Sequence, residues 1–225
     1  MANEQWSAVD KYIGEALLQG DPTFDFALKA SDAAGLPAIQ VSACQGKFLQ
    51  LLAQGMGARR VLEVGTLGGY STLWLARALP PDGVLITLEY DPKHAEVARR
   101  NFAAAGLPPS IEVRVGDAKE TLPRLAAEGA APFDFIFIDA DKAGYPEYFK
   151  WAMKLSRPGS LIIAENVVRN GAVADAASTD ASVLGVRRMN ELVAAERRVS
   201  ATALQTVGSK GYDGFTLALV TMDVT

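Results

Sequence analysis

The spacing of hydrophobic and polar positions changes near residue 60. Over residues 1–57 apolar side chains recur at helical intervals, with turns at Asp21-Pro22 and Gly35-Leu36-Pro37. From residue 60 onward, short apolar runs alternate with amphipathic segments, which is typical of repeated strand–helix units. The predicted strands cover 61–64, 84–88, 111–115, 133–138 and 161–164, and the predicted helices cover 70–78, 92–105, 120–128, 146–155 and a segment that ends at 196.

Two further apolar runs close the chain, at 199–205 and 215–220, and the Gly-rich stretch 208–214 between them predicts a hairpin. Repeated strand–helix units form a mostly parallel sheet, whereas a hairpin pairs its strands antiparallel. We therefore expect an α/β fold: a doubly wound, mostly parallel, seven-stranded sheet with a C-terminal antiparallel hairpin, helices on both faces and an N-terminal helical extension.

Polar clusters directly follow two of the predicted strands. Asp139-Ala140-Asp141-Lys142 comes after the run 133–138, and Glu165-Asn166 comes after the run 161–164. If these strands pair in parallel, both clusters emerge at the edge where open α/β sheets bind their ligands. Carboxylate and amide oxygens suit hard divalent cations such as Mg²⁺, Mn²⁺ or Ca²⁺. The sequence thus predicts a metal site with a lysine beside it.

A glycine-rich loop, Gly65-Thr66-Leu67-Gly68-Gly69, follows the first predicted strand and opens a helix. Glycines there allow a ligand to approach the backbone closely, although the spacing is not the G-x-G-x-x-G of dinucleotide sites. Glu89 ends the second strand, where an acid can accept hydrogen bonds from ribose hydroxyls, and Gly116-Asp117-Ala118 follows the third. The alternative is a tight turn with no ligand and a solvated Glu89.

Composition and charge argue against several kinds of binding partner and catalytic site. A net charge of −4 offers no electrostatic reason for binding nucleic acid or an anionic membrane. The single cysteine, Cys44, cannot form an internal disulfide, and the first residues do not resemble a secretory signal, so we expect a cytoplasmic protein. The single histidine, His94, argues against a zinc site or a nucleophile triad built on histidine.

Several motifs in one order resemble the cation-dependent O-methyltransferases of the caffeoyl-CoA and catechol type, which use S-adenosylmethionine. The resemblance covers about residues 40–220 and implies a Rossmann-like fold, a single methyltransferase domain over 1–225 and a contribution of the 1–57 extension to the acceptor site. The motifs are 61–71 (VLEVGTLGGYS), 86–89 (ITLE), 116–118 (GDA), 137–142 (FIDADK) and 165–171 (ENVVRNG).

The resemblance assigns roles position by position. Lys142 and Asp139 would be catalytic, with Lys142 beside the acceptor oxygen, and Asp141 and Asn170 would line the acceptor pocket. The divalent cation, Mg²⁺ by preference, would be held by Asp139, Glu165 and Asn166. S-adenosylmethionine would be bound by Val41, Glu63, Gly65, Thr66, Ser71, Glu89, Asp117, Ala118 and Asp139. The family usually has Asp where this chain has Glu165, which adds a methylene at a metal ligand.

The resemblance implies a homodimer and a small hydroxylated aromatic acceptor. A catechol fits better than a lone phenol, because two vicinal hydroxyls can chelate the cation. Two alternatives stay open at this point: an NAD-dependent oxidoreductase on the same architecture, and a cofactor-binding protein without turnover. The glycine spacing disfavours the first, and Glu165 is the feature that favours the second.

Overall fold

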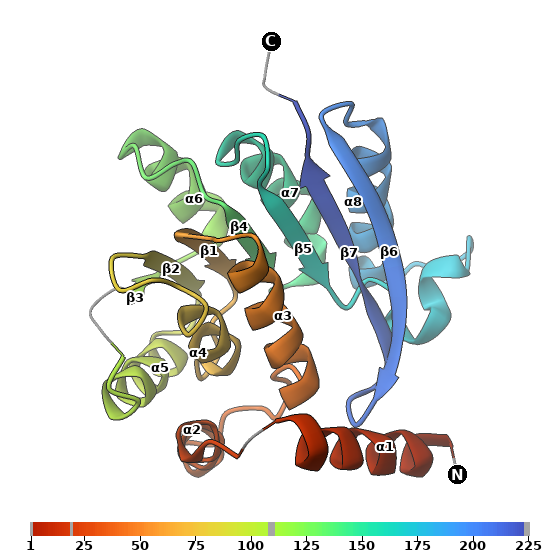
Figure 1. Ribbon diagram of the computed structural model, residues 1–225. Coiled ribbons are helices and arrows are strands. Elements are labelled where there is room, and N and C mark those ends of the chain that lie inside the picture. The colour runs from red at the N-terminus through yellow and green to blue at the C-terminus, as the bar shows by residue number, and fades with distance from the viewer. Residues whose placement is uncertain (1, 19, 108–110, 223–225) are drawn as a thin grey trace. The chain divides into compact units, whose positions relative to one another are not determined.

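A computed structural model describes residues 2–18, 20–107 and 111–222 of the chain (Figure 1). The chain separates into two compact units, one made of 1–117 with 208–210 and the other of 118–207 with 211–225. None of the helices in these described residues has the length and apolar character needed to cross a membrane.

The first unit carries a parallel half-sheet in the order β3-β2-β1. Its strands pair along their full length, with Val64 opposite Leu88 and Glu89 opposite Val115. Helices α4 and α5 lie next to β2 and β3 (Figure 1). The elements are α1 (Ala2–Leu17), α2 (Pro22–Ala33), α3 (Ala43–Gly55), β1 (Arg60–Val64), α4 (Tyr70–Ala76), β2 (Val84–Glu89), α5 (Pro92–Ala104) and β3 (Ile111–Val115).

The second unit carries the order β4-β5-β7-β6, in which β4 and β5 are parallel and β7 runs antiparallel to β5. Helices α7 and α8 lie side by side along one face of β5, β7 and β6 (Figure 1). The elements are α6 (Ala118–Ala127), β4 (Phe135–Ile138), the 3₁₀ turn η1 (Lys142–Gly144), α7 (Tyr145–Lys154), β5 (Leu161–Glu165), the 3₁₀ segment η2 (Arg169–Ala174), α8 (Ala181–Ala195), β6 (Val199–Gly208) and β7 (Gly211–Val220).

The described strands and their directions confirm the predicted seven-stranded, mostly parallel sheet with its antiparallel hairpin. The apolar runs of β4 and β5 were predictable because these two strands are buried on both faces, with every residue buried. In the structure, the predicted turn at Asp21-Pro22 and the predicted helix start at Asp91-Pro92 each lie at the beginning of a helix. Each aspartate accepts a hydrogen bond from the backbone N–H two residues on, and each proline occupies the first helical turn.

The hairpin differs from its prediction, because most of the Gly-rich stretch 208–214 belongs to the strands. Only Ser209 and Lys210 separate β6 from β7. Gly214 lies within β7, where a larger residue would not fit. A Cβ at this position would collide with the Leu204 carbonyl oxygen and would lie 2.7 Å from Val168 Cγ2. This glycine therefore serves close packing of the backbone rather than a turn, a distinction that local sequence does not reveal.

Candidate functional site

The glycine loop of the first unit rests on a connected network of buried polar groups. Glu63, in the middle of β1, is fully buried, and its carboxylate accepts hydrogen bonds from the hydroxyls of Ser71 (2.6 Å), Thr87 (2.7 Å) and Thr72. The Thr87 hydroxyl lies 2.6 Å from that of Thr66. A buried carboxylate needs such donors, so Glu63 and its partners stabilise the strand beneath the loop.

Glu89 joins the same network at the end of β2. Its Oε2 accepts the backbone N–H groups of Thr66 (3.1 Å) and Leu67 (2.7 Å), and its Oε1 accepts that of Asp91 (2.9 Å). His94 Nδ1 lies 3.5 Å from Oε1. A carboxylate offers about four lone-pair sites, so one remains for a ligand hydroxyl. Glu89 therefore fixes the loop and still has capacity for the predicted ribose contact.

The backbone of this loop has the left-handed conformations that close ligand approach requires. Gly65 has φ 102° and Gly69 has φ 82°, while Leu67 between them has φ 51°. Asn101 of α5 donates from Nδ2 to the Gly68 carbonyl at 2.8 Å, which holds the loop from below. The loop is thus a preformed backbone cradle, which fits the predicted position for the methionine part of S-adenosylmethionine.

Two further predicted cofactor residues, Val41 and Asp117, also belong to the first unit. The Gly116 N–H donates to the Glu89 carbonyl at 2.8 Å, which brings the end of β3, and Asp117 after it, beside the end of β2.

Val41 is buried just before α3, in a segment whose Ala38 carbonyl accepts a hydrogen bond from the Lys210 ammonium at 3.0 Å. Burial lowers the pKa of the Lys210 ammonium. Ala118 and Asp139 belong to the second unit.

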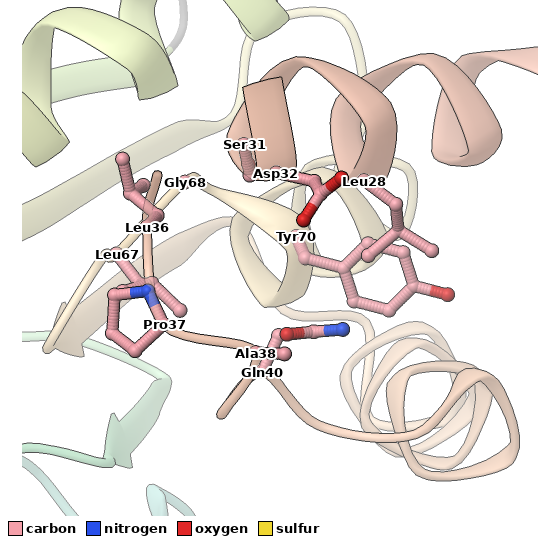
Figure 2. Close-up of a pocket in the computed structure, with 10 residues that line it drawn as sticks. All are labelled: Leu28, Ser31, Asp32, Leu36, Pro37, Ala38, Gln40, Leu67, Gly68 and Tyr70. Atoms are coloured by element: carbon pink, nitrogen blue, oxygen red, sulfur yellow. The ribbon is translucent and has the colours of Figure 1, made fainter. Parts of the chain in front are cut away.

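A pocket of about 190 Å³ opens in the first unit between α2, the segment after it and the glycine loop. Figure 2 shows Asp32 and Leu28 of α2 facing Tyr70, with Gln40 and Pro37 on the other side. Leu67 and Gly68 border it, but none of the ten residues that line it is among the predicted site residues. The pocket therefore does not by itself locate the cofactor or the acceptor.

The second unit brings the predicted metal ligands to one edge. Ile138 pairs with Ala164 in the parallel β4–β5 ladder, so Asp139 and Glu165 follow at the same level. The Tyr145 hydroxyl lies 2.7 Å from the Glu165 carbonyl and 3.2 Å from that of Ile138, and so links the two strand ends. Burial first, then the charges of Asp139 and Glu165, raise the pKa of Tyr145 well above its usual value, which keeps this phenol a donor.

The donor set at this edge fits a hard divalent cation. Asp139 and Glu165 supply carboxylates, and Asn166 Nδ2 lies 3.4 Å from Glu165 Oε1, which leaves the amide oxygen for a cation. Among the described residues, no group of three His, Cys, Asp or Glu side chains could hold a metal ion. The predicted ligand set therefore consists of two carboxylates and one amide.

Lys142 and Asp141 behave differently, although they are adjacent. The Lys142 ammonium lies 2.8 Å from Asp139 Oδ1 and 4.9 Å from the centre of the Tyr145 ring, and its side chain is only 10% exposed. Asp141 instead accepts hydrogen bonds from the Gly144 N–H (2.8 Å) and the Tyr148 hydroxyl. Lys142 is thus held beside Asp139, whereas the Asp141 carboxylate mainly caps η1.

The loop after β5 adopts unusual backbone angles. Asn166, Arg169 and Asn170 have φ values of 54–56°, and Gly171 has φ 87°. Left-handed geometry at a non-glycine residue costs on the order of 1–2 kcal/mol, and the cost is smallest for asparagine. Asp213 of β7 offsets this cost, because its Oδ1 accepts the backbone N–H groups of Val168 (2.9 Å) and Arg169 (3.0 Å). The loop carries the predicted Asn166 and Asn170.

Sequence reasoning missed several residues that build these sites. Thr72 and Thr87 complete the Glu63 network, Tyr145 links the ends of β4 and β5, and Asp213 holds the loop after β5. Thr87 lies between apolar residues of its strand and Thr72 lies in the first turn of a helix, so neither position stands out in the sequence. Asp213 lies in a Gly-rich stretch that predicted a turn. Only the pairing of β5 with β7 brings it to the site.

Comparison with known proteins supports the family resemblance that the sequence motifs indicate. The O-methyltransferase family model matches residues 23–220. A catechol O-methyltransferase of Niastella koreensis is 55% identical over 220 residues, 98% of this chain and all of that protein. An O-methyltransferase from Bacillus cereus, solved in complex with SAH, is 57% identical and superposes with a TM-score of 0.96 over 97% of this chain and 99% of that one.

The O-methyltransferase TomG of Streptomyces achromogenes, solved in complex with SAM, is 52% identical and superposes with a TM-score of 0.95 over 98% of this chain and 99% of that one. Such identity over nearly the whole chain confirms the Rossmann-like methyltransferase fold that the motifs predicted. The chain belongs to the O-methyltransferase family and is an S-adenosylmethionine-dependent O-methyltransferase.

Proposed function

We propose that this enzyme is a divalent-cation-dependent O-methyltransferase that methylates one hydroxyl of a catechol-like aromatic. The observation that carries the proposal is the meeting of Asp139 and Glu165 at one edge, with Lys142 ion-paired to Asp139. The names of relatives support the acceptor class, since one 55% identical to this chain is a catechol O-methyltransferase.

Asp139, Glu165 and Asn166 would hold the cation, Mg²⁺ by preference. A bound cation of this kind favours the oxyanion form of an acceptor hydroxyl and fixes its direction. The two vicinal hydroxyls of a catechol offer two oxygens to such an ion, which a lone phenol cannot do. Glu165 is one methylene longer than the aspartate usual in the family, so its β5 position must accommodate that length.

Lys142, once its ammonium has released a proton to solvent, would take the proton of the acceptor hydroxyl, and a positioned base of this kind contributes roughly 10²–10⁴ in rate. The ion pair with Asp139 holds the Lys142 nitrogen at the edge where the acceptor would bind. Asp141 and Asn170 would border the acceptor. Because the Asp141 carboxylate already accepts from Gly144 and Tyr148, its contact with the acceptor would use its remaining lone pairs.

The methyl donor would lie on the glycine loop. Glu63, Gly65, Thr66 and Ser71 would surround its methionine part, with Val41 closing over it. Glu63 would act largely through the Ser71 and Thr72 hydroxyls that it binds. Glu89 would hold the ribose hydroxyls, Asp117 and Ala118 would border the adenine, and Asp139 would also face the donor. Holding donor and acceptor in line can contribute on the order of 7–11 kcal/mol.

A cytoplasmic location and a homodimer are part of the same proposal. The single cysteine supports the first, and the family resemblance supports the second. Light scattering on the purified chain should give twice its mass of 23.9 kDa.

The test is a methyl-transfer assay with labelled S-adenosylmethionine and a panel of catechols and single phenols, with Mg²⁺ or with excess chelator. We expect labelled catechol product with Mg²⁺ only, and little product from single phenols. Equal transfer in chelator would refute cation dependence, and transfer only to non-aromatic acceptors would refute the acceptor class. Calorimetry with S-adenosylmethionine and with NAD should show binding of the first alone, against the oxidoreductase alternative.

A further inference from the structure

Asp213 connects β7 to the loop that follows β5. In the antiparallel ladder Glu165 pairs with Phe215, so β7 continues beside the chain after β5 has ended. The Val167 N–H donates to the Gly214 carbonyl at 2.9 Å, and the next two N–H groups, of Val168 and Arg169, both donate to Asp213 Oδ1. One carboxylate thus replaces the strand partner that the loop backbone has lost.

The conformation of this loop needs an external support. Arg169 and Asn170 are consecutive left-handed residues, and Gly171 follows with φ 87°. Arginine has no short polar side chain that could bond its own backbone in this geometry, so contacts from elsewhere must hold it. Asp213 supplies them at the backbone, and its Oδ2 lies 3.9 Å from the Arg169 guanidinium. A carboxylate is a stronger acceptor for two N–H groups than a neutral oxygen.

We infer that Asp213 is a positioning residue for acceptor binding. It holds the conformation of the loop 166–171, which carries Asn166 beside Glu165 and the exposed Asn170. This inference rests on the proposed function, because the roles of Asn166 and Asn170 belong to that proposal. Asp213 itself touches backbone and Arg169, so its effect on the reaction passes through the loop.

The chain offers a matched control for this inference. Asp180 precedes α8, and its Oδ1 accepts two successive backbone N–H groups, those of Ser182 (2.8 Å) and Val183 (3.0 Å). Asp180→Ala therefore removes the same kind of contact as Asp213→Ala, but at a helix start rather than at the loop. A change in acceptor binding that Asp213→Ala causes and Asp180→Ala does not can therefore be attributed to the loop.

The experiment compares wild type, Asp213→Ala, Asp213→Asn and Asp180→Ala in acceptor KM, kcat, affinity for S-adenosylmethionine and hydrogen exchange of the 167–171 amides. For Asp213→Ala we expect catechol KM to rise about tenfold or more, with affinity for S-adenosylmethionine changed by less than about twofold. Exchange at Val168 and Arg169 should become faster. Asp213→Asn should show smaller changes of the same sign, because its amide oxygen is a weaker acceptor.

Asp180→Ala should lower the melting temperature with catechol KM and loop exchange unchanged. The inference is overturned if Asp213→Ala leaves KM and exchange as in wild type, or if Asp180→Ala raises KM equally. If the alanine variant does not fold, Asp213→Asn decides, and wild-type exchange in it overturns the inference. The exchange measurement needs no acceptor, so it tests the loop even if wild type methylates no catechol and the proposed function fails.

Discussion

Individual side chains at the second-unit site divide between those that would contact reactants and those that hold the backbone in place. Lys142 and Asp139 form a short ion pair, 2.8 Å long, at the edge. Tyr145 is fully buried and links two strand ends through its hydroxyl. Lys142 and Tyr145 lie only three positions apart, yet substituting them should have different consequences. A change at Lys142 should alter the rate, and a change at Tyr145 should alter stability.

Lys142→Arg separates the charge of Lys142 from its proposed role as a base. Arginine keeps a cation beside Asp139 but stays protonated at any assay pH. We therefore expect kcat to fall by about 10²–10⁴ while affinity for S-adenosylmethionine, measured by calorimetry, is retained. The control is Lys150→Arg in α7, where the lysine is 53% exposed and pairs with Glu147. A Lys142→Arg enzyme with wild-type kcat would rule out the base.

Tyr145→Phe should lower the free energy of unfolding by about 1–3 kcal/mol, because it leaves buried carbonyl oxygens at Ile138 and Glu165 without their phenol donor. The ring, and its contact with Lys142, would remain. Urea denaturation measures the change. Tyr90→Phe is the control, since Tyr90 is 77% exposed and should shift stability by less than about 0.5 kcal/mol. Equal stability of the two variants would mean that the link contributes nothing.

At the scale of elements, close backbone contacts set where the functional segments lie. Gly185 of α8 faces η1, and a Cβ there would collide with the Lys142 carbonyl oxygen and lie 2.9 Å from Ala143 Cα. The neighbouring atoms belong to backbone, so they cannot move aside as a flexible side chain could. The segment that carries Lys142 is therefore positioned by a glycine on a helix some 40 residues later in the chain.

Gly185→Ala and Gly14→Ala should shift stability in opposite directions. Gly14 lies in α1 with open space around its Cα, so alanine there should raise the free energy of unfolding by about 0.5–1 kcal/mol through helix propensity. Gly185→Ala should lower it by about 1–3 kcal/mol and reduce kcat, because α8 must move away from η1. Stabilisation by Gly185→Ala would show that this packing is loose.

The elements show what the sequence could predict. The central strands and the edge positions of Asp139, Glu165 and Glu89 followed from apolar runs, because a strand buried on both faces is largely apolar and its polar residues gather at its end. Glu63, fully buried in the middle of β1, is an exception. The hairpin bounds, the Thr87 contact with Glu63 and the Asp213 contact with the loop depend on which strands pair and in which register. No local pattern contains that information, since the partners lie 24 to 45 residues apart.

At the scale of the whole molecule, the chain passes between its two compact units three times, after residues 117, 207 and 210. Neither unit is therefore a continuous segment that a linker joins to the other. This connectivity supports the expectation of a single domain over 1–225, in which the segment 1–57 is an extension rather than a separate domain.

Calorimetric unfolding tests the single-domain expectation. We expect one transition for which the calorimetric and van't Hoff enthalpies agree, because residues 208–210 of the first unit interrupt the chain of the second. S-adenosylmethionine should raise the midpoint of the whole transition, since a ligand that binds only the native state stabilises all that unfolds with it. Two transitions, of which the ligand shifts only one, would show that the units unfold independently.

The most direct test of the account is equilibrium binding of Mn²⁺, followed by electron paramagnetic resonance, to wild type, Asp139→Asn and Asp141→Asn. Asp141 is the matched control, because its carboxylate accepts hydrogen bonds from the Gly144 N–H and the Tyr148 hydroxyl and is not among the predicted metal ligands. We predict a single tightly bound ion per chain in wild type and Asp141→Asn, and affinity weaker by about a hundredfold or more in Asp139→Asn. Equal Mn²⁺ affinity in all three proteins would contradict the account.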